Sequence, residues 1–301
     1  MSQPAVSGVC PVVDTPFTED GDVDFESLDR LVQTLTAEGS DALALFGYAT
    51  EFYKLSTTER KQMLDRVLPA CEEENIPSVV SVTAEATNPA IENAGLIEQA
   101  GADVIMVLPP HTRGPPEPAI AEHLTDLAGS VSVPVMIQYA PGSTGVTHDP
   151  EFFASLYRNT ENIDLFKIEC DPPGKFISRL LELTDGQADV LVGRAGLEMI
   201  EGYDRGAIGV MPASAMYDIY LEIHRRYHEE SRDSAIDLHA ELVAVLNQLT
   251  KLGIAWEKRI LAKRGLIETA HCRKPEETFD EVYDQLFDDY YEKFVMPHIT
   301  D

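Results

Sequence analysis

Short apolar runs alternate with longer segments of helical periodicity along most of this chain. Several runs are apolar throughout rather than alternating, as expected for strands that are covered on both faces. We predict eight strands, at residues 6–13, 42–45, 78–82, 103–107, 135–138, 164–168, 189–192 and 207–210. Pro134 directly precedes the fifth run, at a strand start, where a missing N–H donor is tolerated.

Helix start and stop signals occupy the segments between these runs. Asp24 and Ser56 each precede a helical pattern as N-cap candidates, and Asn88-Pro89 begins another helix. Gly39 and Gly101 follow helical patterns at the position where glycine favours helix termination. The order of elements is therefore strand, helix, strand, helix over most of the chain.

Eight β/α units in this length predict an α/β fold, a (β/α)8 TIM barrel, over residues 1–225. The alternative is a doubly wound open sheet, which would more often carry a G-x-G-x-x-G after its first strand, and this chain has none. Residues 226–301 form a predicted C-terminal helical extension, because the strand signal stops and two amphipathic patterns follow. We interpret the aromatic stripe at 279–294 as packing.

Composition restricts the class of function. The chain has 301 residues, 44% of them hydrophobic, and a net charge of −29. Nucleic-acid binding is excluded, because phosphate contacts need clustered Lys and Arg. The acidic residues are spread along the sequence, which we interpret as a solvated surface coat suited to a salt-rich, halophilic cytoplasm.

Cysteine usage and hydropathy indicate a cytoplasmic protein. The four cysteines are scattered without C-x-x-C spacing, as expected of reduced thiols. The N-terminal residues lack a charged segment followed by a long apolar run, so no signal peptide is expected. No window approaches 18 uninterrupted apolar residues, so no membrane span or membrane partner is expected either.

Lys167 is the candidate for chemistry, because it alone among the lysines lies in a predicted strand, near the C-terminal end. Catalytic groups of a (β/α)8 barrel come from these strand ends. An apolar environment disfavours an ammonium ion, and a neutral amine can form a Schiff base with a carbonyl group. The structural alternative is a lysine that pairs with Glu169 or extends its head to water. Tyr139, directly after the neighbouring fifth strand, could move protons beside it.

The order of these residues resembles the dihydrodipicolinate synthase / N-acetylneuraminate lyase family over essentially the whole chain. The resemblance rests on Pro16-Phe17, a G-x-x-x-E at 47–51 followed by L-S-x-x-E-R at 55–60, Tyr139, Lys167, and G-A-I-G-V at 206–210. It implies a barrel, commonly a homotetramer, that binds a 2-keto acid as a Schiff base on Lys167, with Tyr139 as acid and base. No metal and no cofactor is implied beyond the covalent substrate.

Departures from the family pattern indicate the branch. The usual G-T-T-G-E is replaced by residues 47–51, G-Y-A-T-E, so Thr50 is the remaining hydroxyl candidate and Ala49 a substrate contact. Residues 140–145 lack the arginine that synthases use for a second carboxylate, and Pro110-His111 replaces paired tyrosines. Gly193, Arg194 and Met211 follow strands seven and eight as substrate-binding candidates, although Arg194 could equally pair with a surface acid.

The leading hypothesis is a Schiff-base lyase acting on a 2-keto-3-deoxy sugar acid, similar to 2-keto-3-deoxy-pentonate dehydratases. The alternatives are an aldolase of the 2-keto-3-deoxygluconate type that releases pyruvate, a dihydrodipicolinate synthase, and a non-catalytic metabolite-binding relative. A phosphosugar enzyme using strands seven and eight is a further alternative, but the G-V-M-P-A-S segment at 209–214 has no basic residue.

The acidic coat generates a first prediction. Surface repulsion is screened over only about 3 Å in roughly 1 M salt, against about 10 Å in 0.1 M. We expect the melting temperature, followed by circular dichroism, to fall steeply when KCl is lowered from about 2 M to about 0.1 M. Full thermal stability in the dilute buffer would contradict the halophilic interpretation.

Overall fold

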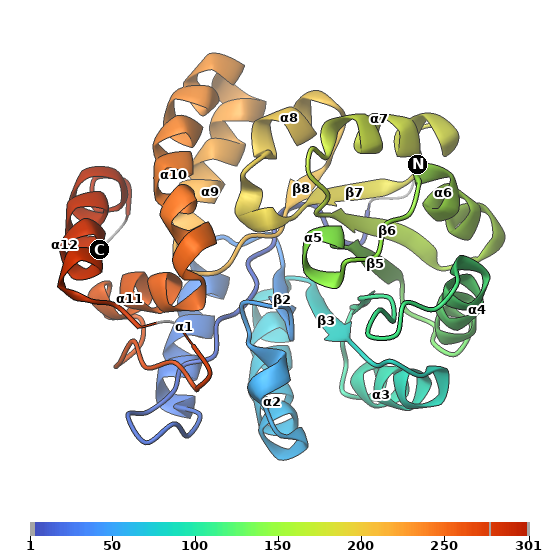
Figure 1. The fold of residues 1–301 in the computed structure, drawn as a ribbon, viewed down its shortest axis with the longest axis horizontal. Coiled ribbons are helices and arrows are strands. Elements are labelled where there is room, and N and C mark those ends of the chain that lie inside the picture. Colours follow the sequence, from blue (N-terminus) through green and yellow to red (C-terminus); the bar gives the residue numbers. More distant parts are fainter. Residues whose placement is uncertain (1–3, 277, 300–301) are drawn as a thin grey trace. The chain divides into compact units, whose positions relative to one another are not determined.

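The computed structural model of the chain describes residues 4–276 and 278–299. Within these ranges the backbone forms two compact units, each assembled from separate stretches of sequence (Figure 1). Residues 4–10 together with 77–211 form the first unit. Residues 11–76 together with 212–276 and 278–299 form the second unit.

The first unit is built on a parallel sheet in the order β1-β8-β7-β6-β5-β4-β3. Every residue of β3, β4 and β5 is buried, as expected for strands that are covered on both faces. The strands of this sheet are β1 (Gly8–Val9), β3 (Ser78–Val82), β4 (Val104–Val107), β5 (Val135–Tyr139), β6 (Ile163–Ile168), β7 (Asp189–Val192) and β8 (Gly209–Val210).

Helices follow the strands of the first unit and cover the sheet (Figure 1). Neighbouring helices pack in pairs, α3 with α4 and α6 with α7, and α6 buries Phe152 and Phe153. The helices are α3 (Thr87–Gln99), α4 (Glu117–Ala128), α5 (Pro141–Thr144), α6 (Pro150–Asn159), α7 (Gly174–Leu183) and α8 (Met199–Asp204).

The second unit contains one strand and the remaining helices. Strand β2 (Leu43–Leu45) makes a parallel bridge from Ala44 to Val12. Its helices are α1 (Phe25–Ala37), α2 (Thr57–Glu74), α9 (Tyr217–Arg225), α10 (Arg232–Leu252), α11 (Ile254–Lys263) and α12 (Glu281–Tyr290).

The predicted caps of the second unit are confirmed. Asp24 accepts a hydrogen bond from the Ser27 N–H, and Ser56 forms a capping box with Glu59. Gly39, with φ of 92°, follows the end of α1 in the left-handed conformation that glycine adopts without strain. Local side-chain chemistry therefore sets these helix ends.

The predicted (β/α)8 class is confirmed by eight parallel strands that alternate with helices and are followed by C-terminal helices. The first strand is shorter than predicted, because Pro11 has no N–H to continue a ladder and pairing resumes only at Val12. The pattern analysis missed α11, which Gly253 separates from α10 with φ of 61°. A domain boundary at residue 225 stays a prediction.

Part of the aromatic stripe of the C-terminal helices packs against α11. Trp256 of α11 is 1% exposed, and its ring centroid lies 5.1 Å from that of Phe287 and 5.9 Å from that of Phe279. Tilted and edge-on contacts at these distances are the favoured geometry of aromatic pairs. Phe279 and Phe287 therefore pack as interpreted, whereas Val282 and Tyr283 of the same stripe are 73% and 40% exposed.

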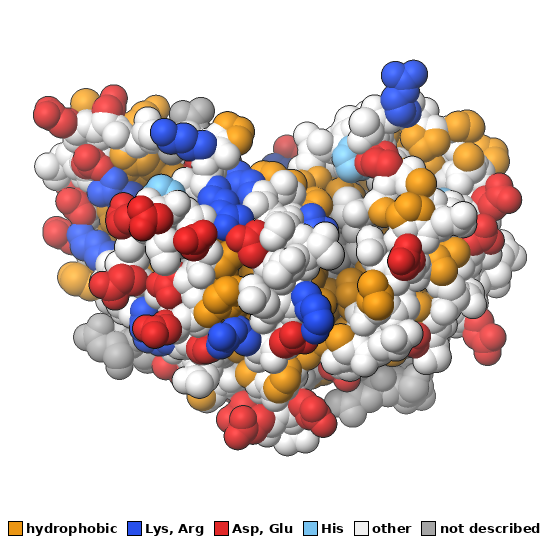
Figure 2. All heavy atoms as spheres, turned by 90° about the horizontal axis from the view of Figure 1, so that it is seen from below, with side chains coloured by type: hydrophobic (Ala, Val, Ile, Leu, Met, Phe, Trp, Pro, Cys, Tyr) orange, Lys and Arg blue, Asp and Glu red, His pale blue; other side chains and the backbone are white. Residues whose placement is uncertain are grey.

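Acidic side chains are distributed across the face of the molecule shown in Figure 2, with Lys and Arg side chains interspersed among them. This distribution agrees with a solvated coat rather than a single charged patch. None of the helices within the described ranges is long and apolar enough to cross a membrane.

Two carboxylates lie at the N-terminal ends of neighbouring strands in the first unit. Asp189 begins β7 in register with Leu165, the residue after Asp164 in β6. Burial, together with the smaller effect of the negative charge of Asp164, raises the pKa of Asp189 from 3.8 to about 6. The N-terminal ends of barrel strands serve stability rather than catalysis, so this pair reports on folding.

Asp189→Asn is expected to stabilise the protein more at pH 8 than at pH 4.5. The folded-state pKa lies above the unfolded value, so the stability contributed by protonated Asp189 is complete below pH 3.8 and is lost as pH rises through about 6. The neutral amide does not suffer this loss. The measurement is the melting temperature of variant minus wild type at both pH values, at fixed salt.

Glu92→Gln, at an exposed position of α3, is the matched control and should give the same difference at both pH values. If the melting temperature of Asp189→Asn minus that of wild type is equal at pH 8 and pH 4.5, or smaller at pH 8, the raised pKa of Asp189 is contradicted.

Candidate active site

Lys167 lies one residue before the end of β6, as predicted. In the ladder it is in register with Gln138 of β5 and Leu191 of β7. Its side chain is only 5% exposed, so its amine is withdrawn from bulk water. This is the C-terminal end of the strand, where catalytic groups of such barrels lie.

The Glu169 carboxylate faces the Lys167 amine, with 3.4 Å between Nζ and Oε1. Two further groups fix this carboxylate. The Gln138 side-chain N–H donates to Oε2 at 2.8 Å, and the Arg194 main-chain N–H donates to Oε1 at 3.2 Å. The ion pair expected under the structural alternative is therefore present, and the ammonium does not extend to water.

Gly193 provides the space that Glu169 occupies. A Cβ atom at position 193 would lie 2.2–2.6 Å from three side-chain atoms of Glu169, far inside van der Waals contact. The Gly193 N–H also donates to the Ile168 carbonyl at 3.0 Å. This predicted substrate-binding residue thus determines where the carboxylate beside Lys167 can lie.

Arg194 begins a strained turn after β7. Arg194 and Ala195 have φ of 49° and 54°, in the left-handed region that residues other than glycine rarely adopt. The Arg194 Nη1 lies 3.0 Å from Asp171 Oδ2 and 3.4 Å from Glu198 Oε1. The Asp171 side chain is 71% exposed, so the pairing of Arg194 with a surface acid, left open by the sequence, is present.

Burial raises the pKa of the neighbouring Glu198 above its usual range, and nearby Arg194 opposes that shift. The Arg194 guanidinium thus pairs with the exposed Asp171 carboxylate and with the mostly buried Glu198.

Tyr139 is the last residue of β5, and its hydroxyl is engaged by the main chain of His148. The hydroxyl donates to the His148 carbonyl at 3.0 Å and accepts from the His148 N–H at 3.1 Å. Its ring lies 4.9 Å from those of Phe153 and Phe176, and burial raises its pKa. From β5, the Gln138 side chain contacts the Lys167–Glu169 pair through its hydrogen bond to Glu169.

His148 is itself positioned by an acidic partner. Its Nδ1 lies 3.0 Å from Glu117 Oε2, and its ring stacks on Phe152 at 4.4 Å. The segment that holds the Tyr139 hydroxyl is therefore rigid, because both the main chain and the side chain of His148 have fixed partners.

Met211, the remaining predicted residue of the first unit, follows β8 and is 2% exposed. Its main-chain N–H donates to the Val192 carbonyl at 2.8 Å. It extends the ladder between β7 and β8, and its side chain belongs to the core.

Ala49 and Thr50 belong to the second unit, in the loop after β2. Thr50 is fully buried, and its hydroxyl donates to the Val13 carbonyl at 2.7 Å. Its own carbonyl accepts from the Thr15 hydroxyl at 2.6 Å. Ala49 is partly exposed beside it. The loop carries the predicted residues in a fixed conformation.

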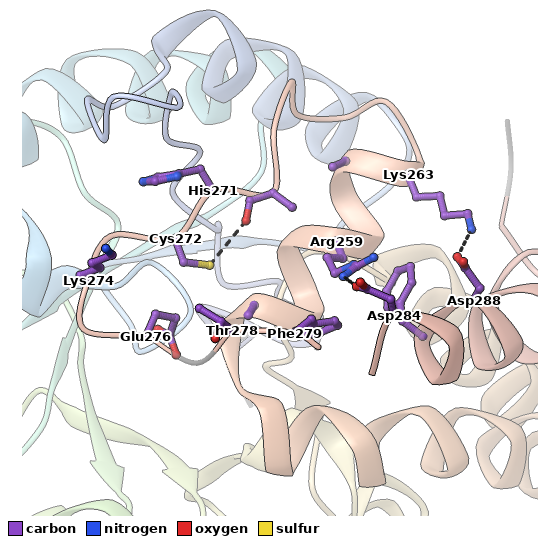
Figure 3. Close-up of a pocket in the computed structure, with 14 residues that line it drawn as sticks. Arg259, Lys263, His271, Cys272, Lys274, Glu276, Thr278, Phe279, Asp284 and Asp288 are labelled. Atoms are coloured by element: carbon purple, nitrogen blue, oxygen red, sulfur yellow. Dashed lines mark hydrogen bonds and ion pairs between the residues drawn. The ribbon is translucent and has the colours of Figure 1, made fainter. Parts of the chain in front are cut away.

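A separate cavity of about 600 Å³ lies within the second unit, between α11, α12 and the segment at 270–279 (Figure 3). Arg259 pairs there with Asp284, and Lys263 pairs with Asp288. These cations are neutralised by exposed or half-exposed acids, unlike Lys167. The cavity therefore offers no counterpart of the amine in β6.

Sequence reasoning missed Gln138 as a site residue and treated Glu169 only as a partner of Lys167. A signal for Glu169 was present, because alternate residues of a strand share one face and position 169 is two beyond Lys167. No local signal marks His148, which reaches Tyr139 through the loop after β5. Among the residues that the structure describes, no three His, Cys, Asp or Glu side chains are grouped to hold a metal ion.

Comparisons with known proteins place this geometry in a family. The L-2-keto-3-deoxyarabonate dehydratase of Azospirillum brasilense is 26% identical over 282 residues, which are 91% of this chain and 90% of that enzyme. The 4-hydroxy-tetrahydrodipicolinate synthase of a Nitratiruptor species is 30% identical over 218 residues, 70% of each chain.

The solved structure of dihydrodipicolinate synthase from Rhodopseudomonas palustris superimposes with a TM-score of 0.89 at 23% identity, over 97% of this chain and 98% of that one. At this identity the likeness establishes the fold alone. The sequence profile of the Dihydrodipicolinate synthetase family matches residues 5–292. This protein therefore belongs to the dihydrodipicolinate synthetase family, as the order of its motifs indicated.

Proposed function

We propose that this protein is a Schiff-base lyase that dehydrates a 2-keto-3-deoxy sugar acid, of the pentonate class. The observation that carries the proposal is the buried Lys167 amine facing a fixed Glu169 carboxylate at 3.4 Å. A relative named as a 2-keto-3-deoxyarabonate dehydratase, matched over 91% of the chain, supports the choice of substrate class.

The first step forms the imine. Glu169 takes a proton from the Lys167 ammonium, and the neutral amine attacks the C2 carbonyl carbon of the keto acid. The carbonyl oxygen leaves as water after two proton transfers, which gives a protonated imine. The low exposure of the Lys167 side chain keeps bulk water away from the reacting atoms.

The second step removes water across C3 and C4. The Glu169 carboxylate accepts a C3 proton, and the electron pair of that bond forms the enamine. The enamine electrons then expel the C4 hydroxyl group, which leaves as water with a proton donated by Tyr139. Loss of a C5 proton and reprotonation at C3 then convert the unsaturated imine into an enol at C4–C5, which tautomerises to the C5 aldehyde as C4 gains a proton from solvent. Solvent returns the proton from Glu169 to Tyr139, and hydrolysis of the imine frees Lys167 and the semialdehyde product.

The ends of the substrate are assigned to the two loop regions. Ala49 and the main chain around Thr50 bind the keto-acid carboxylate, and Thr50 relays protons near it. Arg194 binds the distal hydroxyl groups, from a turn held by Glu169 through the Arg194 N–H. Gly193 and the main chain of Met211 are proposed to complete this end. The proposed chemistry needs no metal or organic cofactor. The resemblance to the family implies that the protein assembles as a homotetramer.

Cleavage of the C3–C4 bond by an aldolase is the second candidate, because it shares the imine and enamine steps. Synthase activity is also represented among the relatives, including the one at 30% identity. The absence of any arginine at 140–145 disfavours a second carboxylate on the substrate, and hence a synthase.

Product analysis tests the proposal. The purified protein is incubated with 2-keto-3-deoxy-pentonates and with 2-keto-3-deoxygluconate, and the products are identified by mass spectrometry. We expect a semialdehyde keto acid from a pentonate, and no product with Lys167→Ala, whose folded state is checked by circular dichroism. Pyruvate plus an aldehyde would replace the dehydratase assignment by an aldolase. Turnover by Lys167→Ala at the wild-type rate would contradict the mechanism.

The separate roles of Glu169, as the C3 base, and Tyr139, as the proton donor to the C4 hydroxyl, can be tested with pyruvate. Pyruvate can form the enamine, but it has no C4 hydroxyl group to lose. Exchange of the pyruvate methyl hydrogens for deuterium, followed by proton NMR, needs only the C3 base. We expect Glu169→Gln to slow this exchange by a factor of about 10²–10⁴, and Tyr139→Phe to retain it while losing dehydration. Equal exchange rates in wild type and Glu169→Gln would remove Glu169 from the mechanism.

A further inference from the structure

The loop after β2 is strained at both of its ends. Phe46 and Glu51 have φ of 63° and 54°, and neither is glycine. Residues of this kind persist in the left-handed region only where the surrounding structure over-determines them. Gly47 packs directly on Val12, where a Cβ atom would lie 2.8 Å from the valine side chain. Something must therefore hold residues 46–51 in this shape.

The Glu51 carboxylate is held from two sides by buried lysines. Glu51 and Lys258 of α11 are both fully buried, and the Lys258 Nζ pairs with Glu51 Oε1. Lys54 Nζ lies 2.7 Å from Glu51 Oε2 and 2.7 Å from Glu276 Oε2. We name Glu51, Lys54, Lys258 and Glu276 the loop clamp.

The surroundings of Lys258 fix its amine in place. The Nζ lies 4.1 Å from the centre of the Phe17 ring, and it donates to the His271 carbonyl at 3.3 Å. Arg273, two residues beyond His271, donates to the Lys54 carbonyl at 2.9 Å and pairs with Glu59 at the start of α2. The C-terminal segment thus binds the main chain of the loop as well as its charges.

A purely stabilising role does not explain the loop clamp. Desolvating a buried ion pair costs about as much as the attraction returns, and well-packed apolar residues would stabilise the fold at least equally. A buried charge pair does select one conformation, because only one arrangement satisfies both partners. The arrangement selected here is the one that carries Ala49 and Thr50.

We propose that Glu51 and Lys258 are positioning residues, which hold the Gly47–Thr50 loop in the conformation that binds the keto-acid carboxylate. This inference rests on the proposed function, which assigns Ala49 and Thr50 to that carboxylate. It gives the C-terminal helices a role in substrate binding, since α11 and Glu276 supply half of the loop clamp. Glu276 also forms part of the wall of the cavity in Figure 3.

The test compares Lys258→Met, and the paired variant Glu51→Gln/Lys258→Met, with Lys263→Met. Lys263 lies on the same helix and pairs with Asp288 of α12, outside the loop clamp. The paired variant removes both charges together, so no single buried charge is left without a partner. Circular dichroism and the melting temperature establish that each variant is folded.

Hydrogen–deuterium exchange is the first readout. We expect peptides that cover residues 46–56 to exchange roughly tenfold faster in the paired variant than in wild type, with Lys263→Met unchanged. Peptides from the first unit should be unaffected. Unchanged exchange at 46–56 in a folded paired variant would overturn the inference, whether or not the protein has the proposed activity.

The substrate dependence of dehydration is the second readout. A misplaced carboxylate site should raise KM by roughly 10–100-fold while kcat stays within about threefold of wild type. A KM equal to that of wild type, in a variant whose loop exchanges faster, would also overturn the inference. Absence of turnover in the wild type would instead reject the proposed function, and the exchange experiment would still decide whether the loop clamp holds the loop.

Discussion

The contact between the Lys167 amine and the Glu169 carboxylate is the constraint on which the proposed chemistry depends. At 3.4 Å the carboxylate forms an ion pair with the amine, and the proposed mechanism assigns it the proton transfers around Lys167. Glu169 holds this place because Gln138 and the Arg194 N–H bind its oxygens and position 193 carries no side chain. Three neighbouring strands thus fix one buried ion pair.

The second unit also contains a buried carboxylate that is fixed by several partners, but we propose a different role for it. Its buried carboxylate, Glu51, is also fixed by groups from distant segments, and it also lies beside residues with left-handed backbone conformations. In the first unit we propose that the fixed carboxylate transfers protons, and the strained turn at Arg194 follows it. In the second unit the fixed carboxylate shapes a loop. Strain at both places is tolerated because several contacts determine each conformation.

Local sequence pattern was sufficient for the fold and for Lys167. Apolar runs and cap residues located the strands and helices, because burial and capping act over a few residues. Lys167 was conspicuous because it interrupts an apolar strand. The pattern could not show that the Tyr139 hydroxyl is held by His148, or that Lys258 pairs with Glu51. Such contacts depend on side-chain directions and long-range packing, which no short window of sequence contains.

Reductive trapping tests the central claim most directly. The wild-type protein is incubated with pyruvate, reduced with borohydride, and examined by intact mass and peptide mapping. The account predicts one covalently reduced pyruvate per chain, carried on the peptide that contains Lys167. A protein that gains no mass, or an adduct on a lysine other than Lys167, would contradict it.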